Sequence, residues 1–169
     1  MTFRGALILL LMAATPAFPA DPRGEVPVGG TLREATLEGL NGPPAKLSMY
    51  RGRPLIINVW ASWCGPCRQE MKSLERLAWR DRSRDFAIIG ISTDDYADKA
   101  KSYLAVAHAT ISHYLDSGLQ MESMLGASRL PLTVLVGTDG QVLQKIFGAR
   151  DWDSADSKRL IEAAFGRIY

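Results

Sequence analysis

The 169-residue sequence is poor in the residues that cross-link small exported domains or bind metals, with two cysteines and two histidines. An excess of charge of one sign is also lacking, because 20 basic residues stand against 18 acidic ones and the basic residues are dispersed. Without a basic stripe interleaved with aromatic residues, no nucleic-acid partner is expected. The sequence has no G-x-G-x-x-G fingerprint and no phosphate-binding loop, so no cofactor is expected either.

Long apolar runs are scarce, and the run near the N-terminus is short. Residues 5–14 are apolar, follow Arg4 and precede several small residues. Ten residues are too few to span a bilayer, but this pattern is typical of a secretory signal peptide. We therefore expect residues 1–20 to be a signal peptide, cleaved after Ala17 or Ala20, and the protein to be periplasmic. If the signal stays uncleaved, it would anchor the chain to the membrane.

The rest of the chain is expected to form one α/β domain. Residues 21–30 are rich in proline and glycine and indicate an extended linker, whereas residues 31–169 are long enough to bury a core. Apolar periodicity predicts strands at 31–40, 45–47, 54–60, 86–92, 111–115, 131–137 and 141–147, and helices after Cys64 and at 96–108, 119–125 and 154–168. Alternating strands and helices indicate a central mixed sheet flanked by helices on both faces.

Two short motifs predict local structure. Asn41-Gly42 is typical of a tight hairpin turn, here between the first two strands. Thr93-Asp94-Asp95 precedes a helical pattern and predicts the N-cap of that helix.

The two cysteines belong to the motif Trp63-Cys64-Gly65-Pro66-Cys67, where a predicted strand is followed by a predicted helix. The amides and dipole of a helix N-terminus stabilise negative charge, which lowers the pKa of the first thiol. Cys64 is therefore expected to be a nucleophilic thiolate. Cys67 lies one helical turn on and can resolve the mixed disulfide that Cys64 forms. The motif predicts a thiol–disulfide oxidoreductase.

Two other interpretations of the cysteine pair are weaker. A structural disulfide across four residues would constrain the unfolded chain by only about 2 kcal/mol, against about 3 kcal/mol for a loop of fifteen. The histidines, His108 and His113, have the spacing of a zinc or copper pair, but the gap from Cys67 is far longer than in a zinc finger. No metal site is therefore predicted, and a thiol-based metal-binding module is kept as an alternative function.

The motif and its surroundings resemble the thioredoxin superfamily, and more specifically its exported TlpA/ResA-like branch, which includes cytochrome c maturation reductases. The resemblance covers about residues 30–165 and rests on the stretches 51–60, 63–67, 90–95, 129–136, 139–140 and 148–154. It implies a thioredoxin fold with an added N-terminal β-hairpin.

The resemblance also implies a substrate-binding surface next to the cysteines. It maps the family's cis-proline onto Pro131 and suggests that the Leu130 backbone pairs with a substrate strand. The substrate-binding residues that it implies are Trp63, Gly65, Pro66, Leu130 and Pro131. Leu132 departs from the pattern, because many relatives have Thr or Ser there.

Two more positions gain a meaning from this resemblance. Thioredoxins carry a buried Asp six residues before the first cysteine, but this chain has Asn58, which cannot take up a proton. In the exported reductases a Glu three residues after the second cysteine can take that part, and here it is Glu70. Glu70 is thus expected to be catalytic, exchanging a proton with Cys67. The alternative is an exposed helix residue without such a role.

The family resemblance also implies the direction of electron transfer and the partners of the protein. Gly65-Pro66 is the dipeptide of reducing family members, which favours a reductase of protein disulfides over a periplasmic oxidant or isomerase. The implied substrates are apocytochrome c or copper-chaperone thiols. A membrane thiol–disulfide electron donor would keep the cysteines reduced. We expect a monomer.

Overall fold

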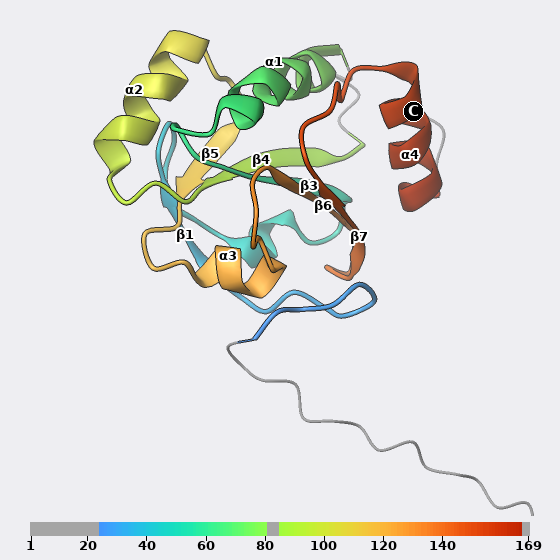
Figure 1. The fold of residues 1–169 in the computed structure, drawn as a ribbon. Coiled ribbons are helices and arrows are strands. Elements are labelled where there is room, and N and C mark those ends of the chain that lie inside the picture. Colours follow the sequence, from blue (N-terminus) through green and yellow to red (C-terminus); the bar gives the residue numbers. More distant parts are fainter. Residues whose placement is uncertain (1–23, 81–84, 167–169) are drawn as a thin grey trace, which may run out of the picture.

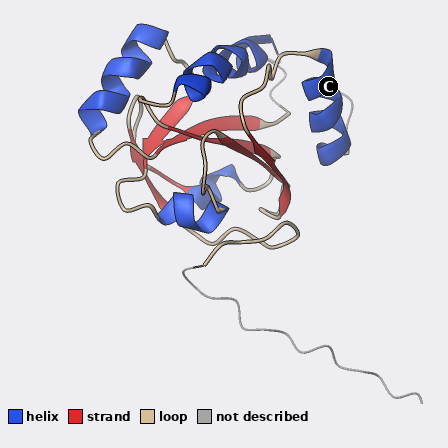
Figure 2. Cartoon of the chain, in the orientation of Figure 1, coloured by secondary structure: helices blue, strands red, loops and turns tan. Residues whose placement is uncertain are grey.

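The computed structural model describes residues 24–80 and 85–166 and places a sheet between two layers of helices (Figures 1 and 2). The predicted signal peptide lies outside the described residues. In chain order the elements are β1 (Thr36–Gly39), β2 (Ala45–Lys46), the 3₁₀ helix η1 (Leu47–Tyr50), β3 (Leu55–Trp60), α1 (Gly65–Arg80), β4 (Ala87–Ser92), α2 (Ala97–Ala107), β5 (Ser112–Leu115), α3 (Gln120–Leu125), β6 (Leu132–Val136), β7 (Val142–Phe147) and α4 (Ala155–Phe165).

The seven strands form one mixed sheet in the order β2-β1-β5-β4-β3-β6-β7. The three central strands β5, β4 and β3 are parallel, whereas β6 pairs antiparallel with β3, and β7 with β6. All six residues of β3 are buried, as a continuous apolar run predicts for a strand covered on both faces. In this register Asn58 lies opposite Gly90 of β4 and Thr133 of β6. The predicted mixed sheet with flanking helices is therefore confirmed.

Alternate residues of β3 enter the cores on opposite faces of the sheet, as the two-residue period of a strand requires. Ile57 packs in one core with Met121 and Leu125 of α3. Ile56 packs in another, which includes Leu74 of α1 and Ile161 of α4. Figure 1 accordingly shows α1, α2 and α4 over one face and α3 over the other. Helix α1, which carries the cysteine motif, is thus held by apolar packing along its length.

The predicted N-terminal hairpin is present, but the prediction of a tight turn at Asn41-Gly42 is wrong. Strands β1 and β2 pair antiparallel, yet five residues connect them, from Leu40 to Pro44. Pro43 and Pro44 have no N–H to donate, so the ladder cannot start directly after Gly42. Asn41 bonds across to β5 instead: its Nδ2 donates to the Ile111 carbonyl at 2.9 Å and its Oδ1 accepts from the His113 amide at 2.8 Å.

The predicted N-cap of α2 is also wrong. The helix begins at Ala97 after Tyr96, which has extended backbone and makes no side-chain cap hydrogen bond. The carboxylate of Asp94 does not reach the helix because it binds Ser62 and Ser92. A sequence that is typical of a helix cap therefore stabilises the loop before the cysteines instead.

Residues 24–30, expected as a linker, lie against the domain. Val26 is buried in the core beside α3, and its amide donates to the Met124 carbonyl at 2.8 Å. The Gly29 amide donates to the Val142 carbonyl of β7 at 2.8 Å. This segment is thus part of the folded unit. Within the part of the chain that the structure describes, no helix has the length and apolar character needed to cross a membrane.

Candidate active site

Cys64 and Cys67 lie where the central strand β3 ends and α1 begins, and a disulfide of 2.00 Å joins them. Cys64 is 6% exposed and Cys67 is fully buried, so Cys64 is the sulfur that a substrate can reach. The Cys67 amide donates to Cys64 Sγ at 3.2 Å. An amide at a helix N-terminus that points to this sulfur would also stabilise a Cys64 thiolate.

The loop before Cys64 is fixed by Asp94, a buried residue beyond the end of β4. Asp94 Oδ2 accepts from the Ser62 amide at 2.8 Å and from Ser92 Oγ at 2.7 Å, and its Oδ1 accepts from Ser62 Oγ at 2.6 Å. No motif around the cysteines pointed to Asp94. The topology of the sheet could have indicated it, because β3 and β4 are parallel neighbours and the loops that follow them therefore lie at the same edge of the sheet.

Glu70 lies on α1, one turn beyond Cys67, and is only 2% exposed. Its Oε1 accepts from Asn58 Nδ2 at 2.6 Å, and its Oε2 accepts from the Arg150 amide at 3.1 Å and from Trp152 Nε1 at 3.0 Å. Burial raises the pKa of the Glu70 carboxyl, although these hydrogen bonds oppose the shift. Glu70 is therefore not an exposed helix residue. It is a carboxyl suited to hold or release a proton nearer neutral pH.

Asn58 links Glu70 to β6, where its Nδ2 also donates to Thr133 Oγ1 at 3.0 Å. Asn58 is itself 1% exposed, so the amide is a fixed part of the core below the cysteines. The position that holds an ionisable Asp in thioredoxins thus holds a neutral hydrogen-bond donor to the carboxylate of Glu70.

The loop before β6 supplies the next part of the site. The Leu130–Pro131 peptide bond is cis, as the resemblance implied. Leu130 packs against the apolar cluster that contains both cysteines, so the loop borders the disulfide. Trp63, on the other side of Cys64 in the sequence, is 72% exposed, and Pro66 is exposed as well. An accessible apolar surface therefore surrounds the Cys64 sulfur.

The two histidines do not join the cysteines in a metal site. His113 lies buried in β5 against Trp60, whereas His108 ends α2 in a left-handed conformation. Burial lowers the pKa of His113 to about 3, so its ring is neutral. Among the described residues, no group of three or more His, Cys, Asp or Glu side chains is placed to hold a metal ion.

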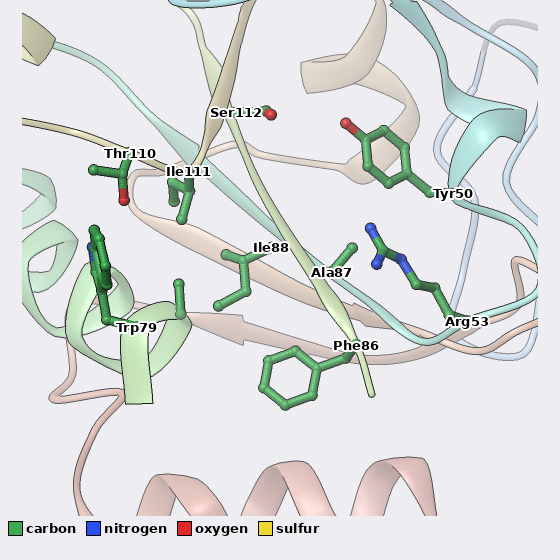
Figure 3. A pocket seen from close by; sticks show the side chains of 10 residues that line it. Tyr50, Arg53, Trp79, Phe86, Ala87, Ile88, Thr110, Ile111 and Ser112 are labelled. Carbon is green, nitrogen blue, oxygen red and sulfur yellow. The ribbon is translucent and has the colours of Figure 1, made fainter. Parts of the chain in front are cut away.

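A cavity of about 430 Å³ lies at the opposite end of the sheet (Figure 3). Its walls include Ala87 and Ser112, which start β4 and β5, whereas the cysteine motif follows the end of the parallel strand β3. Trp79 of α1 borders one side and Arg53 the other. None of the candidate redox residues lines this cavity, so it is separate from the cysteine site.

A thioredoxin-type sheet with a disulfide between the end of β3 and the start of α1, reachable through Cys64, defines a thiol–disulfide oxidoreductase. Comparison with known proteins specifies the family: a Redoxin family model matches residues 27–161, and the chain belongs to that family. Within it, the chain is a protein of the ResA/DsbE type, as its relatives show.

The relatives span most of the chain. The thiol-disulfide oxidoreductase ResA of a Bacillus cereus strain is 24% identical over 153 residues, which cover 88% of each protein. The thiol:disulfide interchange protein DsbE of Vibrio cholerae is 33% identical over 132 residues, covering 74% of this chain and 69% of that protein. A crystal structure of a DsbE-type protein from Chlorobium tepidum aligns with a TM-score of 0.76 and 26% identity, covering 83% of this chain and 99% of that one.

Proposed function

We propose that the protein is a periplasmic reductase that transfers two electrons from the Cys64/Cys67 dithiol to protein disulfides. The observation that carries this proposal is the buried Glu70 carboxyl, held one turn beyond the buried Cys67. A reductase must deprotonate its second, shielded thiol within the mixed disulfide, and a carboxylate with a raised pKa can accept that proton. The Gly65-Pro66 dipeptide also supports a reductase, because it is the dipeptide of reducing family members.

The reaction proceeds in two exchanges. The Cys64 thiolate attacks one sulfur of the substrate disulfide, forms a mixed disulfide, and releases the other substrate sulfur as a thiolate. Cys67 then loses its proton to Glu70 and attacks Cys64 Sγ. This step forms the Cys64–Cys67 disulfide and releases the second substrate thiolate. Two electrons have passed from the protein to the substrate, and protons from Glu70 and solvent neutralise the released thiolates.

Substrate binding uses the surface around Cys64. Trp63, Gly65 and Pro66 contact the substrate beside the attacking sulfur, and Leu130 pairs through its backbone with an extended substrate segment next to Pro131. The exposure of Trp63 and the packing of Leu130 beside the cysteines support this assignment. Apocytochrome c or copper-chaperone cysteine pairs are the proposed substrates. A membrane thiol–disulfide donor is proposed to reduce the Cys64–Cys67 disulfide after each cycle.

The test combines a measurement of the reduction potential with the trapping of mixed disulfides. We expect the Cys64/Cys67 couple to have a reduction potential near about −270 mV, and a value near about −120 mV would instead indicate a disulfide donor. Cys67→Ser should accumulate mixed disulfides through Cys64 in periplasmic extracts, whereas Cys64→Ser, the matched control, should form none. The absence of a reversible two-electron couple would favour a metal-binding module over any thiol–disulfide exchange.

A further inference from the structure

We propose that the face around the Cys64–Cys67 disulfide is a basic docking surface for an acidic segment of the protein substrate. The inference rests on the proposed function and specifies the chemistry of its substrate. Three arginines form this surface: Arg68, Arg129 and Arg150. Each belongs to a different chain segment, and hydrogen bonds and packing hold those segments together at the end of the sheet where the disulfide lies.

Arg68 is placed by the cysteine motif itself. It follows Cys67 on the first turn of α1, and its amide donates to the Cys64 carbonyl at 3.2 Å. Its side chain is exposed. Arg68 therefore lies beside the disulfide on the helix side.

Arg129 belongs to the proline loop. It is separated from Pro131 only by Leu130, which packs against the cluster that holds both cysteines. Its guanidinium lies over the Phe147 ring, 5.1 Å from the centroid. A cation–π contact of this kind does not use the N–H donors of the guanidinium, which can still bind a carboxylate.

Arg150 lies in the loop after β7, which is tied to both other segments. The Gly148 amide donates to the Pro131 carbonyl at 2.9 Å, and the Arg150 amide donates to Glu70 Oε2 at 3.1 Å. Arg150 is partly exposed, and its guanidinium lies 5.5 Å from the Trp152 ring centroid. A second arginine thus contacts an aromatic ring beside the cysteine site.

None of these three arginines forms a salt bridge within 4 Å of a carboxylate in the described part of the chain, although the charge of Arg150 also acts on the buried Glu70 carboxyl. Two carboxylates on adjoining segments are already bound: Asp94 accepts from Ser62 and Ser92, and Asp151 pairs with Arg76 at 3.2 Å. Three cations around a reactive disulfide attract a negatively charged partner and repel a positively charged one. The substrate that fits carries Asp or Glu residues close to its disulfide.

The experiment compares three disulfide-containing peptides of one length, with acidic, neutral or basic residues flanking the cysteines. Their second-order rates of reduction by the reduced protein are measured at low and high salt. We expect the acidic peptide to react about tenfold faster than the basic one at low ionic strength, with the difference shrinking as salt screens the charges. The triple variant Arg68→Gln/Arg129→Gln/Arg150→Gln should abolish this preference.

The ratio of rates is the decisive quantity. A change in the Cys64 pKa would alter all three rates together and leave the ratio intact. The matched control removes three exposed cations elsewhere, as Lys46→Gln/Arg53→Gln/Arg159→Gln, and should keep the preference. Equal rates for the three peptides, or a preference that survives in the triple arginine variant, would overturn the docking surface while leaving the reductase in place. No reduction of any peptide would overturn the reductase and this inference together.

Discussion

At the scale of single residues, burial shifts the pKa of two titratable groups in opposite directions, upward for Glu70 and downward for His113. Glu70 is held by three hydrogen-bond donors, which suit the ionised form, while burial favours the neutral form. His113 is buried and makes no side-chain hydrogen bond to other described residues. Burial thus favours the neutral form of both groups, and at Glu70 the hydrogen bonds oppose it.

Replacing Glu70 by Gln should slow the second exchange and spare the first. The amide keeps the shape of the side chain but cannot take the Cys67 proton, so resolution of the mixed disulfide is expected to slow about 100-fold at neutral pH. Rapid mixing with a fluorescent peptide disulfide separates the two steps. Glu75→Gln, on the same helix, is the matched control and should retain both rates. Unchanged resolution in Glu70→Gln would remove Glu70 from the mechanism.

Titration of His113 should make the fold sensitive to acid. Its pKa is lowered to about 3 by burial, against about 6.5 in the unfolded chain, so the unfolded state takes up a proton first as the pH falls. The free energy of unfolding should therefore decrease between about pH 7 and pH 3. Urea unfolding of wild type and His113→Phe across this range isolates the effect, because the variant lacks the titrating ring. Parallel pH profiles for the two proteins would contradict it.

How far the site could be predicted also differs from residue to residue. Cys64 and Cys67 form the C-x-x-C pair, which was sufficient to select them, whereas Glu70 was selected because the family resemblance places a Glu three residues after Cys67. The partners of Glu70 come from β3 and from the loop after β7, and only the tertiary fold brings Asn58, Arg150 and Trp152 to one carboxylate. Burial of Glu70 depends on that assembly. The sequence alone does not show which distant residues come together around Glu70.

At the scale of elements, the central strands and the helices were predictable because their apolar periods are long and uninterrupted, whereas the first strand, expected at 31–40, spans only Thr36–Gly39. Strand β3 differs from its predicted range only by Pro54, and β7 only by Gln141. Errors arose where a polar side chain had two possible partners. Asn41 binds β5 rather than forming a tight turn, and Asp94 binds the loop before Cys64 rather than capping α2. Local propensity describes such residues poorly because the competing partner is distant in sequence.

Asp94 offers a direct test of that loop. In Asp94→Ala the partly buried Ser62 amide and the buried Ser92 hydroxyl lose their carboxylate acceptor, which should lower the free energy of unfolding by about 3 kcal/mol. Asp95→Ala, at the exposed neighbouring position, should change it by less than about 0.5 kcal/mol. Urea unfolding of the oxidised proteins measures both values. Similar stabilities for the two variants would show that the Asp94 hydrogen bonds contribute little.

At the scale of the whole molecule, the folded unit begins before residue 31. Val26 of the N-terminal segment is buried beside α3, whereas Val28, two residues on, is 59% exposed. Val26→Ala should therefore lower the free energy of unfolding by about 2 kcal/mol, and Val28→Ala should leave it within about 0.5 kcal/mol. Chemical unfolding curves of the two variants provide the comparison. Equal curves would place the boundary of the domain after this segment.

The same N-terminal segment has a consequence for self-association. An open strand edge is a template for pairing with another copy of the chain. At one side of this sheet β2 has only two residues and follows Pro43-Pro44. At the other side, residues 29–31 bond to the start of β7: Gly29 donates to the Val142 carbonyl, Val142 donates to the Gly30 carbonyl, and Thr31 bridges to Gln141. The short β2 and the covered start of β7 therefore disfavour edge-to-edge pairing at these places, which suits a protein that must expose apolar side chains around a reactive disulfide.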